Sequence, residues 1–191
     1  MSRIHTPASV EAAPAAAQNA LAAVKQQLGV LPNLFLVVAN SPAALDGYLG
    51  LNGALAKGSL DAKTRERIAL AIAEFNRCGY CLSAHTYLGK NLAKLDDAEI
   101  AANRSGRSND AKANAAVHFA VRIAAARGHV SDSDLTAVRQ AGFDEGQIVE
   151  IVLHVALNTL TNYVNEVAGT VIDFPVVAPA RDVAWPMTRS D

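Results

Sequence analysis

The sequence predicts an all-α protein, and three observations support this. The chain of 191 residues is 51% apolar but only 5% aromatic, and alanine dominates the apolar share. Runs of the β-branched and aromatic residues that favour strands are scarce. Signals for the start and end of helices recur along most of the chain. The length suits one domain that can bury a substantial core.

Three helices are expected in the first half of the chain. The first is rich in alanine and stops at Gly29, and the second starts with Ser41 as its cap and Pro42 at its first position. Gly58 ends the second helix, and residues 76–79 interrupt the pattern of the third. The expected spans are 8–28, 42–57 and 60–75.

Five helices are expected in the second half. Three of them begin at a residue that is followed, three positions later, by a partner able to complete a capping box. These pairs are Asp96 with Glu99, Ser131 with Asp134, and Asp144 with Gln147. The expected spans are 80–94, a short helix from 96, 110–127, 131–140 and 144–167, with a polar loop at 103–109.

We predict one all-α domain over residues 1–173 and an extended tail over 174–191. Within the domain we expect an N-terminal helical extension at about 8–58, a core at about 59–103 and C-terminal helices at about 110–168. Prolines favour an extended tail because they cannot continue a helix. Those of the tail are Pro175, Pro179 and Pro186. Trp185 is expected to pack on a neighbouring surface, such as that of a second subunit.

Charge and hydropathy exclude several classes of function. The formal net charge is −1 and no basic segment stands out, so neither nucleic acid nor a membrane surface is an expected partner. The N-terminus lacks the apolar stretch of a signal peptide, and no apolar run reaches the length of about 18 residues that a membrane span requires. A cytoplasmic protein is therefore expected. No cofactor is predicted, because the chain has neither a glycine-rich phosphate loop nor a haem-attachment motif.

The two cysteines, Cys78 and Cys81, are three positions apart. A disulfide between them would close too short a loop to stabilise the fold much. In a cytoplasmic chain this spacing indicates redox or metal chemistry. At the start of a helix, free backbone N–H groups and the helix dipole stabilise a thiolate. One sulfur can then attack an oxidant, and the other can convert the product into a disulfide.

Two further residues extend the cysteine motif. His85 lies one helical turn after Cys81 and can exchange a proton with its thiol. Glu66 lies twelve residues before the motif, but the break at 76–79 would fold the two helices into a hairpin. Glu66 and His85 would then stand at similar heights, so that Glu66 orients His85. Glu74 is the competing acid, and its helical position predicts a charged, solvated stripe.

Glu66, Cys78-x-x-Cys81 and His85 at these spacings resemble the alkylhydroperoxidase AhpD / carboxymuconolactone decarboxylase superfamily, most closely its peroxidase-related branch with two cysteines. The resemblance implies an AhpD-like helical bundle, with the cysteines at the start of a helix, that assembles as a homo-oligomer, a trimer or hexamer. It implies reduction of a hydroperoxide by Cys81, a disulfide with Cys78, a Glu66–His85 proton relay and an external dithiol or protein reductant.

Tyr80, a candidate site-lining residue, stands where well-studied members carry histidine. A phenol, with an ordinary pKa of about 10, is not a base at neutral pH.

Other interpretations stay open. The cysteines could be buried structural thiols, or they could join His85 and Glu66 in a zinc site. The protein could also be a non-enzymatic helical oligomer that uses the cysteine pair as a redox switch. A decarboxylase-like lyase acting on a small acid or lactone is a third possibility, and its activity would survive replacement of both cysteines.

The last expected helix carries three polar residues in an apolar context. His154, Asn158 and Asn162 follow one another at intervals of four residues and therefore share one face. They are either hydrogen-bonded core groups or a polar wall near the thiols. The remaining histidines are expected in the core (His118) or at the surface (His5 and His129).

Overall fold

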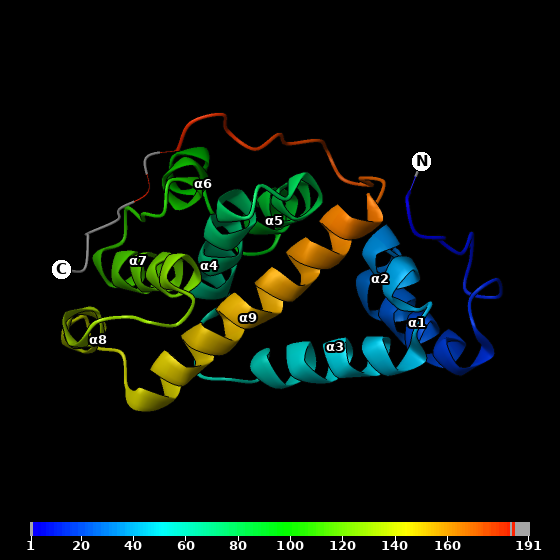
Figure 1. Cartoon of the computed structure of the whole chain (residues 1–191), viewed down its shortest axis with the longest axis horizontal. Helices are drawn as coiled ribbons and strands as arrows, with labels where there is room; N and C mark the ends of the chain where they lie inside the picture. The colour runs from blue at the N-terminus through cyan, green and yellow to red at the C-terminus, as the bar shows by residue number, and fades with distance from the viewer. Residues whose placement is uncertain (1, 184, 186–191) are drawn as a thin grey trace.

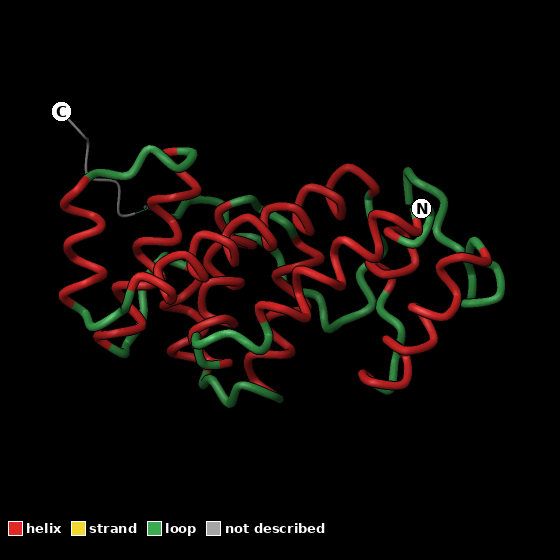
Figure 2. The backbone as a smooth tube through the Cα atoms, turned by 90° about the horizontal axis from the view of Figure 1, so that it is seen from below, coloured by secondary structure: helices red, strands yellow, loops and turns green. Residues whose placement is uncertain are grey.

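The computed structural model describes residues 2–183 and 185, which consist of helices and connecting loops without a strand (Figure 2). This confirms the all-α prediction. The helices of the described residues are α1 (Ala15–Leu28), α2 (Asn33–Val38), α3 (Pro42–Leu55), α4 (Ala62–Phe75), α5 (Gly79–Asn91), α6 (Asp97–Arg104), α7 (Ala111–Ala126), α8 (Asp132–Gln140) and α9 (Glu145–Ala168). None of them combines the length and apolarity needed to cross a membrane.

Helix α4 lies at the centre of the fold. It packs against α5, α6, α7 and α9, and α9 runs diagonally across the front of the molecule (Figure 1). Leu70 and Ala73 belong to a core shared with the N-terminal helices and α5. Ile68 and Ile72 belong to a second core shared with α7, α8 and α9. Because α4 is held from both sides, the side chains that it presents to α5 and α9 have fixed positions.

Most of the predicted helix boundaries are confirmed. The side chain of Ser41 accepts a hydrogen bond at the start of α3 with Pro42 in the first position, and Gly29 adopts the left-handed conformation (φ 75°) after α1. The predicted start of the first helix is wrong, because α1 begins at Ala15 and not at residue 8. Pro14 precedes α1, and a proline disfavours helical backbone in the residue before it.

One of the three predicted capping boxes forms only in part. The boxes at α8 and α9 are complete. At α6, the Asp96 side chain accepts from the Glu99 N–H at 2.7 Å, but the Glu99 carboxylate does not return to Asp96. It accepts from Arg67 Nε at 2.6 Å and from the Asn109 N–H at 2.8 Å. Burial raises the pKa of Glu99, but its hydrogen bonds outweigh burial and lower it to about 2.

The tail is extended where the structure describes it, and it runs along the top of the molecule in Figure 1 past α5 and α6. The Val177 N–H donates to Ser83 Oγ of α5 at 2.9 Å. Trp185 packs edge-on against Phe75 of α4, with ring centroids 5.2 Å apart, so the expectation that it packs on a neighbouring surface is confirmed within the chain itself. Pro186 and the rest of the predicted tail lie outside the described residues.

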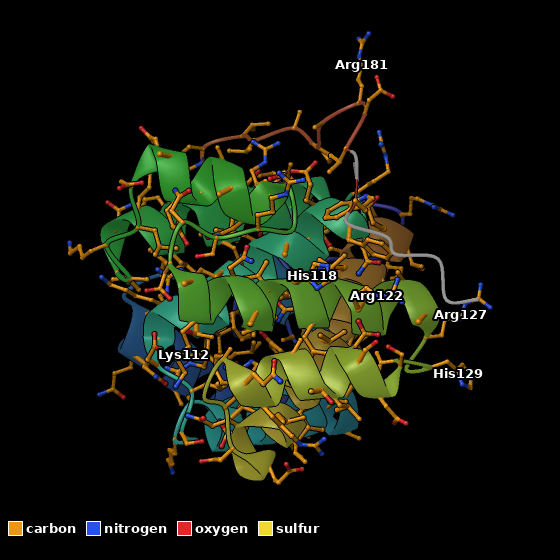
Figure 3. All side chains as sticks on the ribbon, turned by 90° about the vertical axis from the view of Figure 1, so that its left-hand side faces the viewer. Lys112, His118, Arg122, Arg127, His129 and Arg181 are labelled. Carbon is orange, nitrogen blue, oxygen red and sulfur yellow. The ribbon has the colours of Figure 1, made fainter. Side chains whose placement is uncertain are left out.

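The prediction that His118 lies in the core is wrong. His118 is half-buried on α7 (Figure 3) and is not a core residue. It shares a helix face with Asn114 and Arg122, four residues to either side, and this face is the polar one. His5 and His129 are exposed, as expected.

The prediction that Glu74 lies on a solvated stripe is also wrong. Glu74 is buried, with a side chain that is 1% exposed, and not part of a solvated stripe. Its carboxylate accepts from Arg104 Nε at 2.6 Å and from the backbone N–H of Ala180 at 2.6 Å. The helical wheel failed because α6 and the tail, which are remote in sequence, supply a cation and an N–H donor on that face. Glu74 therefore anchors the tail to α4.

We predict that Glu74→Gln lowers the free energy of unfolding by about 2 kcal/mol, because breaking a buried ion pair leaves Arg104 uncompensated. Urea denaturation measures this. Asp97→Asn is the matched control, since it removes an ion pair with Lys90 in which both side chains are well exposed. Exposed pairs add little stability, so equal losses in the two variants would contradict the role assigned to Glu74.

Candidate active site

A sharp chain reversal separates α4 from α5. Arg77 adopts a positive φ of 57°, which is uncommon for a residue with a side chain. The Cys78 N–H donates back to the Ala73 carbonyl at 2.9 Å. Cys78 is the N-cap of α5, and its Sγ accepts from the Cys81 N–H at 3.4 Å. The reversal therefore places the cysteines at the start of a helix and sets α5 beside α4, as the sequence predicted.

The hairpin brings Glu66 and His85 together. Glu66 Oε2 lies 2.9 Å from His85 Nδ1, and both side chains are about one-fifth exposed, at 22% and 21%. Burial lowers the pKa of His85, but the charge and hydrogen bond of Glu66, together with the charge of Cys81, outweigh this and raise it. His85 thus carries a proton over a wider pH range than a free imidazole.

Cys81 is the more acidic of the two thiols. Its hydrogen bond with Cys78 lowers the pKa of Cys81 most, and burial opposes this effect. The charge of His85 and the amides of Asn165 and Asn162 act in the same direction as Cys78, and the pKa of Cys81 falls to about 6. The amide of Asn165 donates to Cys81 Sγ at 3.2 Å.

Cys78 is held as a thiol. Its role as hydrogen-bond donor to Cys81, together with its burial, raises the pKa of Cys78. The two cysteines are not bonded to each other in this structure, and Cys78 is fully buried. The opposite pKa shifts of the two cysteines favour a thiolate on Cys81 and a thiol on Cys78. This is the charge distribution that a nucleophile and its resolving thiol require.

A cavity of about 130 Å³ adjoins Cys81, His85 and Glu66, and Cys78 does not line it. A small molecule in the cavity would therefore meet the Cys81 sulfur first. The other lining residues come from α2, α3, α4, α5 and α9, and they are Leu34, Tyr48, Asn52, Ala56, Arg65, Ala69, Tyr80, Ala84, His154, Leu157, Asn158 and Thr161.

Comparison with known proteins places this arrangement in a family. A model of the carboxymuconolactone decarboxylase family matches residues 42–126, a span that includes the cysteines, Glu66 and His85. The AhpD core of an uncharacterized peroxidase-related protein from Ralstonia eutropha JMP134 has a similar fold, with a TM-score of 0.80 and 24% identity over 90% of this chain and 92% of that chain. The chain therefore contains a segment similar to the carboxymuconolactone decarboxylase family and has the AhpD-like fold.

One protein of similar fold has a named activity. The debrominase Bmp8, in a cysteine-to-alanine variant bound to 2,3,4-tribromopyrrole, has a TM-score of 0.76 and 19% identity over 91% of this chain and 94% of its own. A curated but uncharacterized protein from Haemophilus influenzae is 56% identical over 45 residues. That match covers 23% of this chain and spans 40% of the relative's length.

The Tyr80 side chain is fixed by contacts with two other segments of the chain. Its hydroxyl oxygen accepts from the Leu34 N–H at 3.1 Å, and its ring packs edge-on against Phe174 with centroids 5.8 Å apart. Burial raises the pKa of Tyr80 above its ordinary value. The phenol therefore stays neutral at pH 7, and Tyr80 lines the cavity beside Cys81.

The polar residues predicted on the last helix divide into two groups. His154 and Asn158 line the cavity, and both are buried. Asn162 does not line it, and its carbonyl oxygen accepts from the Asn76 amide at 2.9 Å beside the chain reversal. In this AhpD-like fold, therefore, one face of α9 forms a polar wall for the site at one end and braces the α4–α5 reversal further along.

Sequence reasoning missed Asn165, Arg65 and Tyr48. Asn165 continues the polar face of α9 just beyond Asn162, so extending that stripe by one step would have found it. Arg65 and Tyr48 carry no comparable signal, because their place in the cavity depends on how α3 and α4 pack against α9.

We predict that Asn165→Ala raises the midpoint of the pH profile for alkylation of Cys81 by about one pH unit, since hydrogen bonds to charged groups have this order of strength. Iodoacetamide, with the site of modification located by mass spectrometry, measures the profile. Asn158→Ala is the matched control, because Asn158 lies in the same helix as Asn165 and lines the cavity, but its amide donates to the His154 carbonyl. Equal profiles for Asn165→Ala and the native protein would contradict the role of the amide.

Proposed function

We propose that the protein is a thiol-dependent hydroperoxide reductase. The observation that supports this best is the position of Cys81, a buried cysteine that lines a small cavity and whose surroundings lower its pKa to about 6. Its neighbour Cys78 keeps its proton and lies within one helical turn. The Glu66–His85 pair lines the same cavity and can supply a proton. Nucleophile, resolving thiol and acid thus occupy one site.

The first step is attack of the Cys81 sulfur on the terminal oxygen of the hydroperoxide. The S–O bond forms as the O–O bond breaks, so Cys81 is oxidised to a sulfenic acid and the substrate leaves as an alkoxide. Protonated His85 gives its proton to the alkoxide, which departs as an alcohol. Glu66, which is paired with His85, stabilises the positive charge of His85 before the transfer.

The second step forms the Cys78–Cys81 disulfide. The Cys78 thiol loses its proton and attacks the Cys81 sulfur, and the hydroxide that leaves combines with that proton to form water. An external dithiol or protein thiol then reduces the disulfide and is itself oxidised. The net reaction converts one hydroperoxide and two reducing thiols into an alcohol, water and one disulfide.

Titration of the reduced protein with tert-butyl hydroperoxide tests the proposal. We expect about one equivalent of peroxide to be consumed and an intramolecular disulfide to form, seen as the loss of two hydrogen atoms in the intact mass. Repeated turnover with dithiothreitol should follow. A protein that keeps both thiols free after exposure to peroxide would refute a peroxidase.

Further measurements distinguish the other interpretations. A single slow oxidation that changes the oligomeric state, without turnover, would support the redox switch. Activity on a small acid or lactone that survives replacement of both cysteines would support the lyase. Bromide release from a brominated pyrrole, without peroxide turnover, would point to the reaction of the debrominase.

We also propose that α9 pairs with a second copy of the chain. Its outer face exposes apolar side chains at alternating intervals of four and three residues, the spacing of a helix covered by a like helix. They are Val149, Leu153, Ala156, Leu160, Tyr163 and Val167. We predict that Leu160→Glu lowers the mass measured by sedimentation, whereas exposed Glu145→Gln does not. Unchanged mass in Leu160→Glu would refute this interface.

A further inference from the structure

The proposed reaction leaves the polar groups at one end of the cavity without a role. Cys81 defines the other end, and Asn165 of α9 contacts its sulfur. His154 lies eleven residues before Asn165 on the same helix, or roughly 16 Å along the axis. Arg65 of α4 also lines the cavity, and its charge acts on His154. His154 and Arg65 therefore mark a second end, remote from the reactive sulfur.

His154 is a buried polar side chain in the cavity wall. It is 6% exposed, and its Nε2 atom has no hydrogen-bond partner among the described residues. Burial lowers the pKa of His154 to about 4, so the imidazole is neutral at pH 7. Buried polar atoms nearly always have a partner in a folded protein. A ligand atom that accepts a hydrogen bond in the cavity would supply the missing one.

Arg65 supplies a positive charge beside His154. Its guanidinium donates to the Leu60 carbonyl at 2.7 Å and has further N–H groups available, and it forms no ion pair within the described residues. The two nearby carboxylates hold other donors. Glu66 is paired with His85, and Glu150 accepts from the backbone N–H groups of Ser59 and Leu60, which precede α4.

The exposed part of the cavity lining lies towards the end of α3, and Cys81 belongs to the buried part. Asn52 of α3 and Ala56, which follows α3, line the cavity and are exposed, whereas Cys81 is 4% exposed. A ligand that enters from α3 would therefore place its leading group at the sulfur and its trailing group beside Arg65. The walls between the two ends include Ala69 and Leu157, which suit an alkyl chain.

We propose that the cavity binds a slender acid whose carboxylate is held by Arg65 and His154 while its other end reaches Cys81. A guanidinium matches the two oxygens of a carboxylate, and the Nε2–H of neutral His154 adds a donor to the same group. The reaction at the other end rests on the proposed function, which makes the substrate class a small hydroperoxide that carries a carboxylate.

Protection of Cys81 from iodoacetamide tests this site without any peroxide. The probes are butanoate, hexanoate and octanoate, each paired with the primary amide of the same length. We expect at least one acid to slow alkylation of Cys81 at a concentration about tenfold below that of its amide, the factor expected for a charge-assisted hydrogen bond. Arg65→Gln and His154→Phe should each raise the protective concentration of the acid about tenfold. Arg65→Lys should restore part of the effect.

Lys63→Gln is the matched control, because Lys63 is an exposed cation on the same helix that does not line the cavity. Equal protection by acid and amide in the native protein would overturn the inference, as would full protection in Arg65→Gln. The outcome is separable from the proposed function. Protection without peroxide turnover would refute the reductase and leave the carboxylate site, whereas turnover without selective protection would refute the site alone.

Discussion

Replacement of Cys81 by serine is expected to abolish hydroperoxide consumption, and replacement of Cys78 is expected to leave one round of it. Cys81 lines the cavity and its pKa is lowered to about 6, whereas Cys78 is fully buried and its pKa is raised. A serine hydroxyl has no comparable nucleophilicity at neutral pH, so the O–O bond is not attacked. With Cys78→Ser the sulfenic acid forms on Cys81 but no disulfide follows, so the enzyme stops after about one equivalent.

Stopped-flow measurement of peroxide consumption, followed by intact mass analysis, distinguishes the two variants. Cys78→Ser should gain one oxygen atom, which a sulfenic-acid reagent such as dimedone traps. Ser83→Ala is a control that alters α5 two residues beyond the motif, where the hydroxyl bonds to Gly79 and Val177 and to neither sulfur, and it should retain turnover. If Cys81→Ser consumed peroxide and Cys78→Ser did not, the assignment of the two cysteines would have to be reversed.

The sequence was sufficient to predict the α4–α5 hairpin and the residues that it joins. The chain reversal at 76–79 follows from the loss of the helical pattern there, and helix geometry then places Glu66 opposite His85. The observed separation of 2.9 Å confirms that pairing. Glu66 and His85 lie within about 20 residues of each other in the chain, and over so short a segment local geometry limits the possible arrangements.

The parts of the site that sequence reasoning missed all depend on packing between distant segments. Asn165 reaches Cys81 from a helix more than 80 residues later in the chain, with a sequence separation of 84. Glu74 is buried by a tail segment 106 residues away. A helical wheel contains no information on which element covers a given face. The wheel therefore identified the polar face of α9 but not the contact of that face with Cys81, and it placed Glu74 on a face exposed to solvent.

Replacement of Glu66 by glutamine is expected to reduce peroxide turnover at pH 7 by roughly a hundredfold, the order of effect typical of general acid catalysis. The charge of Glu66 raises the pKa of His85, and the charge of His85 lowers the pKa of Cys81. With glutamine, His85 loses its proton at lower pH, and the Cys81 thiolate then loses the cation that favours it. The midpoint of alkylation should move upward from about 6.

The pH profile separates the two consequences of Glu66→Gln. Alkylation by iodoacetamide needs only the thiolate, so it should recover to the native rate near pH 9, above the raised pKa of Cys81. Peroxide reduction also needs a proton donor for the leaving alkoxide, and His85 is neutral at that pH, so turnover should stay low. Glu74→Gln is the matched control, because it removes a carboxylate from the same helix that does not contact His85. Its profile should coincide with that of the native protein, and a Glu66→Gln profile that did the same would show that the Glu66–His85 pair has no part in activating Cys81.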